Sequence, residues 1–122
     1  MPRPKQVNAL EVLTMSDLVD RISDKSGYTK NNVKTVLSTL REVVLSEVAR
    51  GNAARWKNFG IFVPVIRYTR SKDLKRWRLD KTAIGMAFYP SKAVTKLKPE
   101  IDVDLLLERG EYDGSRHIYA QR

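Results

Sequence analysis

Residues 66–81 form a strongly basic segment between two short, apolar, strand-like segments. It holds seven Lys or Arg residues against two Asp residues. Repulsion between these positive charges keeps the segment from folding onto itself. We therefore expect it to project as a ribbon from the body of the protein. Such a ribbon matches a polyanion, and the phosphate backbone of nucleic acid is the obvious one.

The basic charge of this chain is concentrated in its middle. The 122 residues carry a formal net charge of +9, with a pI near 10.0. Residues 53–98 carry twelve basic against two acidic residues, whereas residues 1–52 carry a net charge of +2 and residues 99–122 one of −3. A hydrophobic content of 42% fits one domain with a modest core, part of which a partner subunit would supply.

Several classes of protein and site are disfavoured by composition. The absence of cysteine excludes disulfides and thiolate metal sites, and the lone imidazole, His117, has no second one with which to bind metal. We expect no metal, no cofactor and no small-molecule substrate, and without a catalytic constellation an enzyme is the least supported class. With no apolar run of about 18 residues and no signal-peptide core, we expect a soluble cytoplasmic protein without a membrane partner.

Two helices are expected in the first half. The first opens at Thr14, with Asp17 in its first turn, and stops at Gly27, while residues 1–13 are aperiodic and typical of a poorly ordered arm. The second runs from Thr29 to Gly51. Its apolar stripe is wide, which favours burial against a second subunit, and consists of Val33, Val36, Leu37, Leu40, Val43, Val44 and Val48.

After Gly51 the sequence pattern becomes typical of β-strands. Residues 54–57 alternate between apolar and basic side chains, and residues 58–60 interrupt this pattern. Residues 61–66 are mostly β-branched or aromatic. Pro64 cannot donate to a ladder, so it is expected at an edge or a bulge. The ribbon returns through residues 82–88, and a last short helix is expected between Ser91 and Pro99.

These elements, in this order, resemble the HU/IHF family of bacterial histone-like DNA-binding proteins. The strongest local matches are Phe59-Gly60-Ile61-Phe62, similar to the family's strand turn, and Ala87-Phe88 followed by Lys92-Ala93-Val94. The resemblance covers residues 14–98, with the arm at about 66–83. Residues 1–13 and the acidic residues 99–122 are extensions, which favour a divergent member and allow a phage origin.

The resemblance implies an α+β fold and an intertwined homodimer. A helical base would carry a three-stranded sheet saddle, with one long β-ribbon arm per subunit reaching around the minor groove. It implies an architectural protein that binds duplex DNA with low sequence specificity and bends or compacts it. Its location would be the nucleoid, in the bacterial cytoplasm or in a phage-infected host cell.

The resemblance and the basic ribbon together select the candidate site residues. The DNA-binding candidates are Arg55, Lys57, Arg67, Arg70, Lys72, Lys75, Arg76, Trp77, Arg78, Lys81, Lys92 and Lys96. The aromatic dimer core would be Phe59, Phe62 and Phe88. Tyr68 and Tyr89 are expected to be packing residues.

Two departures from the family pattern bear on function. Asn58 replaces the first glycine of the strand motif, which is tolerable because asparagine accepts positive φ better than other residues with a side chain. No proline lies between Pro64 and Pro90, so the family's intercalating proline is missing. Any wedge between base pairs would have to be Trp77 or Leu74, while the alternative is that Trp77 simply covers one hairpin face.

Two other functions are compatible with the sequence. Residues 16–50 also fit a helix-turn-helix of a sequence-specific regulator, although the second helix has few side chains suited to base edges. A virion or nucleoid assembly protein whose ribbon binds an acidic protein surface is the other alternative. The acidic tail is also a candidate latch that competes with DNA for the basic saddle.

Overall fold

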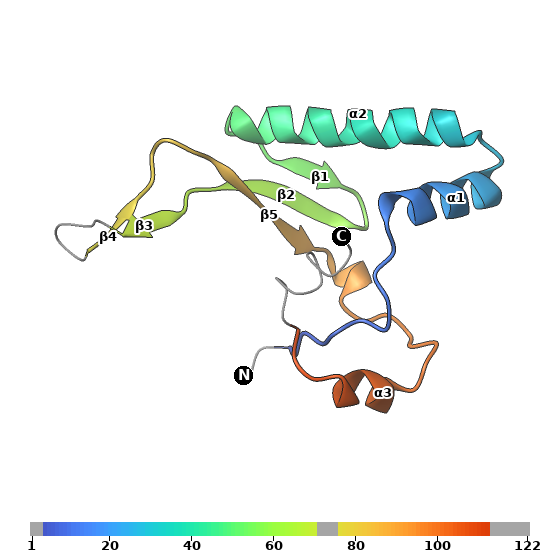
Figure 1. Cartoon of the computed structure of the whole chain (residues 1–122). Helices are drawn as coiled ribbons and strands as arrows, with labels where there is room; N and C mark the ends of the chain where they lie inside the picture. Colours follow the sequence, from blue (N-terminus) through green and yellow to red (C-terminus); the bar gives the residue numbers. More distant parts are fainter. Residues whose placement is uncertain (1–3, 71–75, 113–122) are drawn as a thin grey trace. The chain divides into compact units, whose positions relative to one another are not determined.

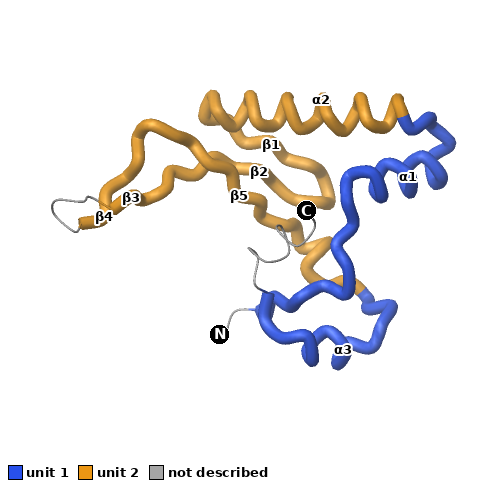
Figure 2. The backbone as a smooth tube through the Cα atoms, in the orientation of Figure 1, with its two compact units in different colours: residues 1–30, 98–122 blue, residues 31–97 orange. Residues whose placement is uncertain are grey.

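The computed structural model describes residues 4–70 and 76–112 and divides the chain into two compact units, residues 1–30 with 98–122 and residues 31–97 (Figure 2). In chain order the elements are α1 (Met15–Ser26), α2 (Lys30–Ala49), β1 (Ala54–Trp56), β2 (Gly60–Val65), β3 (Tyr68–Arg70), β4 (Trp77–Leu79), β5 (Gly85–Pro90), the 3₁₀ turn η1 (Lys92–Val94) and α3 (Val103–Glu108) (Figure 1). The expected α+β class is confirmed.

Helix α1 begins and ends as its sequence predicts. The Thr14 hydroxyl accepts a hydrogen bond from the Asp17 amide at 3.3 Å, and the Asp17 carboxylate accepts one from the Thr14 amide at 3.0 Å. This reciprocal pair is a capping box, and the hydrogen bonds from the Thr14 amide and hydroxyl lower the pKa of Asp17. Gly27 ends the helix at φ +84°, donating to the Ser23 carbonyl.

Strands β1, β2 and β5 form an antiparallel sheet in the order β1-β2-β5. The turn between β1 and β2 places Asn58 at φ +64°, as expected for the residue that replaces glycine there. The long ladder pairs β2 with β5 from Gly60 opposite Pro90 to Val65 opposite Gly85. Strand β1 pairs only as far as Phe62, so Pro64 lies where β2 has lost one neighbour and a missing donor is tolerated.

An aromatic cluster lies on one side of this sheet. The rings of Phe59 and Phe62 lie 5.1 and 4.9 Å from that of Phe88, and Trp56 adds an edge contact to Phe59 at 4.8 Å. Gly60 makes this approach feasible, since a Cβ there would stand 2.5 Å from the Phe88 ring and 2.6 Å from the Tyr89 carbonyl oxygen. The sheet therefore needs glycine at this position for reasons of space.

The helix expected after Ser91 is much shorter than predicted. Only Lys92–Val94 is helical, as a 3₁₀ turn, and the Ser91 side chain makes no capping hydrogen bond. With one turn and no cap, the segment has too few hydrogen bonds to continue as an α-helix. The prediction of a helix over residues 91–98 is therefore wrong in length and type.

Helix α2 leaves much of its wide apolar stripe open to solvent. Val33, Val44 and Val48 are buried, whereas Val36 and Val43 are 65% and 55% exposed. Among the described residues, the only other buried apolar side chain is Val19 of α1. One copy of this chain thus fills only a small core by itself.

The two ends of the chain are hydrogen-bonded to each other. The Asn8 amide donates to the Gly110 carbonyl at 3.1 Å, and the Tyr112 amide donates to the Gln6 carbonyl at 2.8 Å. Side chains join in, because Asn8 Nδ2 donates to the Arg109 carbonyl and Arg109 Nε donates to the Ala9 carbonyl. We call residues 6–9 and 109–112 the terminal clamp. The described part of the predicted N-terminal arm is thus tied to the other end of the chain.

Replacing Gly60 by alanine tests the close approach of the Phe88 ring. We expect Gly60→Ala to lower the free energy of unfolding by about 1–3 kcal/mol, because backbone and ring must both move. Urea denaturation at fixed protein concentration measures this.

Gly85→Ala on the same ladder is the matched control. A Cβ there meets the Val65 methyl at 3.1 Å and Arg67 Nε at 3.2 Å, and the latter is the mobile end of a side chain. Its loss of stability should be smaller, so equal losses for the two variants would contradict this account of Gly60.

Candidate nucleic-acid interface

The register of the three-stranded sheet sorts its residues onto two faces. Arg55 pairs with Ile61, and Ile61 pairs with Tyr89, so these three form one row across the sheet. The adjacent row, which contains Phe62 and Phe88, points to the opposite face because side chains alternate along a strand. We call the face of the Arg55 row the basic face, and the other the aromatic face.

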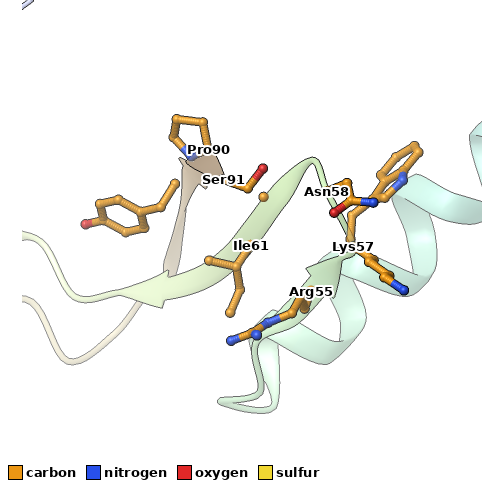
Figure 3. Close-up of a pocket in the computed structure, with 9 residues that line it drawn as sticks. Arg55, Lys57, Asn58, Ile61, Pro90 and Ser91 are labelled. Carbon is orange, nitrogen blue, oxygen red and sulfur yellow. The ribbon is translucent and has the colours of Figure 1, made fainter. Parts of the chain in front are cut away.

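An open hollow lies at the turn end of this sheet (Figure 3). Its volume is about 390 Å³, and its lining includes Arg55, Lys57, Asn58, Tyr89 and Ser91. The Ser91 hydroxyl is hidden from solvent and, within the described chain, has no hydrogen-bond partner. Two cations and neutral polar groups therefore border a concavity that carries no carboxylate in its lining.

Two further predicted cations follow the end of β5. Lys92 opens the turn η1 and Lys96 comes shortly after it, and both side chains are exposed. The Ser91 amide donates to the Phe59 carbonyl at 3.0 Å, which fixes the start of this segment to the turn between β1 and β2. Lys92 is therefore held close to the end of the sheet that carries the hollow.

The arm begins where β2 and β5 give way to the two-stranded sheet of β3 and β4 (Figure 1). At its base the Asp80 amide donates to the Arg67 carbonyl at 2.8 Å. The Asp80 carboxylate accepts hydrogen bonds from the hydroxyl and the amide of Thr82, and these bonds lower the pKa of Asp80. This acidic residue thus closes a turn as a carboxylate.

The register of the arm sorts its residues onto two faces as well. Tyr68 pairs with Leu79 and Arg70 pairs with Trp77, and these four share one face, while Thr69 and Arg78 occupy the other. Tyr68 and Trp77 are 64% and 67% exposed, so both side chains are largely open to solvent. We call the first face the stacking face of the arm.

The arginines of the arm have no acidic partner within the described chain. Over residues 4–70 and 76–112, ion pairs join Lys30 to Asp20 and Arg50 to Glu47, all in or beside the helices. Arg67, Arg70 and Arg78 are exposed. Their charge is therefore available to an external anion.

The predicted site residues form two groups in the structure. Arg55, Lys57 and Lys92 lie around one end of the sheet, and the arm carries Arg67, Arg70, Arg76, Trp77, Arg78 and, in the turn after β4, Lys81. Lys72, Leu74 and Lys75 lie outside the described residues. The predicted aromatic trio of Phe59, Phe62 and Phe88 is brought together.

Sequence reasoning missed three residues of these surfaces. Tyr89, expected to pack, is 58% exposed and shares the basic face with Arg55, so that expectation is wrong for this chain, as it is for Tyr68. Trp56 is a fourth member of the aromatic cluster. The alternation of Phe88 and Tyr89 along β5 was the signal available, since adjacent strand residues cannot both face the cluster.

The described residues do not form a metal site or a membrane span. Within the described part of the chain, no group of three or more His, Cys, Asp or Glu side chains is placed to hold a metal ion. His117 lies outside that part. No described helix combines the length and apolar character needed to cross a bilayer.

Sequence comparisons point to one family. The family model described as "Bacterial DNA-binding protein" matches residues 13–74. The DNA-binding protein HU of Thermotoga maritima is 34% identical over 50 residues, which are 41% of this chain. The match spans 56% of that relative, so the chain covers just over half of its length.

Solved structures share the fold. The Anabaena HU–DNA cocrystal structure is similar with a TM-score of 0.52 and 23% identity, over 66% of this chain and 91% of that one. A mutant of HU from Thermotoga maritima gives a TM-score of 0.50 and 26% identity, over 66% of this chain and 92% of that one. The HU fold expected from the sequence is therefore confirmed.

Proposed function

The chain belongs to the bacterial DNA-binding protein family that includes HU, and we propose that it is an architectural protein that binds and bends duplex DNA as a homodimer. The observation that carries this proposal is the basic arm, whose exposed arginines have no acidic partner in the described chain. The HU–DNA cocrystal structure, whose fold this chain shares, makes duplex DNA the first polyanion to test.

The homodimer follows from the apolar surface that one copy leaves open. Val36, Leu40 and Val43 are all exposed and recur at helical spacing along α2, so they form one stripe. Phe59 and Phe88 of the aromatic cluster are exposed too. A second copy seated on these surfaces would complete the core, with Phe59, Phe62 and Phe88 shared between subunits.

Phosphate neutralisation would supply most of the affinity. Lys and Arg side chains of the basic face and the arm would displace condensed counterions from the duplex, without reading base identity. Sequence would enter through the ease with which the DNA deforms. This mechanism involves no bond-making chemistry, so we assign no enzymatic activity, and we place the protein with the nucleoid of a bacterial cell.

The stacking face of the arm is the candidate for inducing a bend. Trp77 is large and exposed, and Arg70 stands opposite it across the strand pair. Architectural proteins insert apolar side chains between base pairs and recover the unstacking cost through the extra surface that bent DNA contacts. We assign this wedge to Trp77.

The exposed surface of α2 bears on the helix-turn-helix alternative. A recognition helix presents polar side chains to base edges, whereas the exposed Val36, Leu40 and Val43 stripe is apolar. This stripe suits a protein interface better than a DNA groove.

The dimer is tested by placing a charge on the exposed stripe. Val36→Asp should weaken the dimer by about 3 kcal/mol or more, because the interface would bury a carboxylate without a partner. Sedimentation equilibrium measures the dissociation constant. Ser38→Asp is the matched control, since two helical residues turn about 200° and place Ser38 away from the stripe. Equal weakening by both substitutions would argue against this interface.

Binding to duplex DNA is tested by a salt-titrated mobility shift. The double variant Arg76→Ala/Arg78→Ala should bind more weakly at low salt and reduce the slope of log K against log salt by about 0.9 for each phosphate that is no longer neutralised. Lys34→Ala/Arg41→Ala removes the same charge from exposed positions of α2 and should change both quantities little. Equal effects of the two double variants would sink the arm assignment.

The wedge predicts that Trp77 matters more for bending than for affinity. Trp77→Ala should reduce the bend measured by energy transfer between dyes at the ends of a short duplex, and it should leave the salt slope unchanged because it removes no charge. Tyr68→Ala on the same face is the matched control. A full bend in the Trp77→Ala complex would contradict the wedge.

A further inference from the structure

The segment that ends at the terminal clamp carries an acidic and apolar surface of its own. Asp102 caps the start of helix α3, because its carboxylate accepts a hydrogen bond from the Asp104 amide at 3.0 Å. Its apolar side chains Val103, Leu105 and Leu107 are about half exposed, and Asp104 and Glu108 stand exposed among them. We call residues 100–108 the acidic module. The clamp holds its downstream end by four hydrogen bonds between backbone and side-chain groups of residues 6–9 and 109–112.

This surface has no role in the proposed binding of DNA. Residues 100–108 carry four acidic side chains and no basic one, so a phosphate backbone would be repelled. Exposed apolar groups this close together mark a protein contact more often than open surface. The acidic module is therefore a surface for a partner that is both cationic and apolar.

The arm of the same chain has that composition. Its described residues 66–70 and 76–79 carry four arginines and no acidic residue. Four apolar or aromatic side chains of these segments are exposed, namely Ile66, Tyr68, Trp77 and Leu79. The arm and the acidic module thus have opposite charges, and both expose apolar groups.

We propose that the acidic module of one copy docks the arm of another copy of this chain. Arginines of the arm would face Asp104 and Glu108, and the stacking face would cover the exposed apolar side chains of α3. Such a contact is held in part by exposed ion pairs, which are individually weak and screened by salt. It therefore joins copies reversibly when DNA does not occupy the arms.

The absence of cysteine from the chain allows a direct test by disulfide trapping. Full-length Leu79→Cys, on the stacking face of the arm, is mixed with full-length Leu105→Cys, on α3, and oxidised without DNA. The mixed disulfide is identified by mass spectrometry of tryptic peptides. We expect it in clear excess over the disulfide between Leu79→Cys and the control Ser38→Cys on α2. Circular dichroism verifies that each variant is folded.

Charge neutralisation supplies the second readout. Asp104→Asn/Glu108→Gln in the Leu105→Cys chain should lower the yield of mixed disulfide about two- to threefold for each charge removed, the value of an exposed pair. The matched control Asp24→Asn/Glu42→Gln removes the same charge from α1 and α2 and should leave the yield unchanged. Salt at about 1 M, where the Debye length is about 3 Å, should act like the first pair of substitutions.

Three results would overturn the docking. One is a yield of disulfide with the control Ser38→Cys that equals the yield with Leu105→Cys, which indicates random collision. Another is a dominant disulfide between two Leu105→Cys chains, which means that the module pairs with itself. The third is a disulfide that forms within the double variant Leu79→Cys/Leu105→Cys but not between the two single variants, which indicates a latch inside one molecule.

Duplex DNA separates this docking from the proposed function. If both hold, DNA suppresses the mixed disulfide because the two partners compete for the arm. A mixed disulfide that persists on saturating DNA would support the docking and contradict the role of the arm in binding DNA. A chain that binds DNA without ever forming the mixed disulfide would leave the proposed function standing and remove the docking.

Discussion

The antiparallel ladder between β2 and β5 determines which chemistry this protein presents on each face of its sheet. It fixes Ile61 opposite Tyr89 and Phe62 opposite Phe88. A slip of β5 by one residue would move Phe88 onto the basic face and Tyr89 onto the aromatic face. Gly60 protects this register, since only a residue without a side chain fits beneath the Phe88 ring at the end of the ladder.

A second constraint is the small amount of apolar surface that one copy can bury. Phe88 touches Phe59 and Phe62 and still remains exposed, and α2 presents valines to solvent along its length. A chain of this kind gains its core by association, so folding and subunit pairing are expected to be coupled. The same pairing would double the number of arms and thereby the number of cations that one duplex meets.

Local rules in the sequence predicted much of this structure. Thr14, Asp17 and Gly27 act through hydrogen bonds within a few residues, so the limits of α1 follow from the sequence, and Asn58 takes the positive φ expected of it. The expectations that failed depend on contacts that composition does not reveal. Tyr89 looked like a packing residue until the strand register placed it on the same face of the sheet as Arg55. The short turn at Lys92–Val94 looked like a longer helix.

The candidate site was predictable in its charge and less so in its geometry. The seven basic residues of the ribbon predict a polyanion as partner, and this prediction does not require the fold to be known. The division of the arm into a face with Tyr68 and Trp77 and a face with Arg78 requires the pairing of β3 with β4. The clamp between residues 6–9 and 109–112 had no signal in the sequence, because every one of its acceptors is a backbone carbonyl, which any residue carries.

That clamp joins groups about a hundred positions apart, as the Asn8 side chain and the Arg109 carbonyl do. Closing so long a loop has an entropic cost, and only a few solvent-exposed hydrogen bonds offset it. The hydrogen bonds between the two ends should consequently break and re-form many times while the rest of the protein stays folded. Amide protons of Asn8 and Tyr112 would then exchange with water far sooner than those at the centre of the β2–β5 ladder.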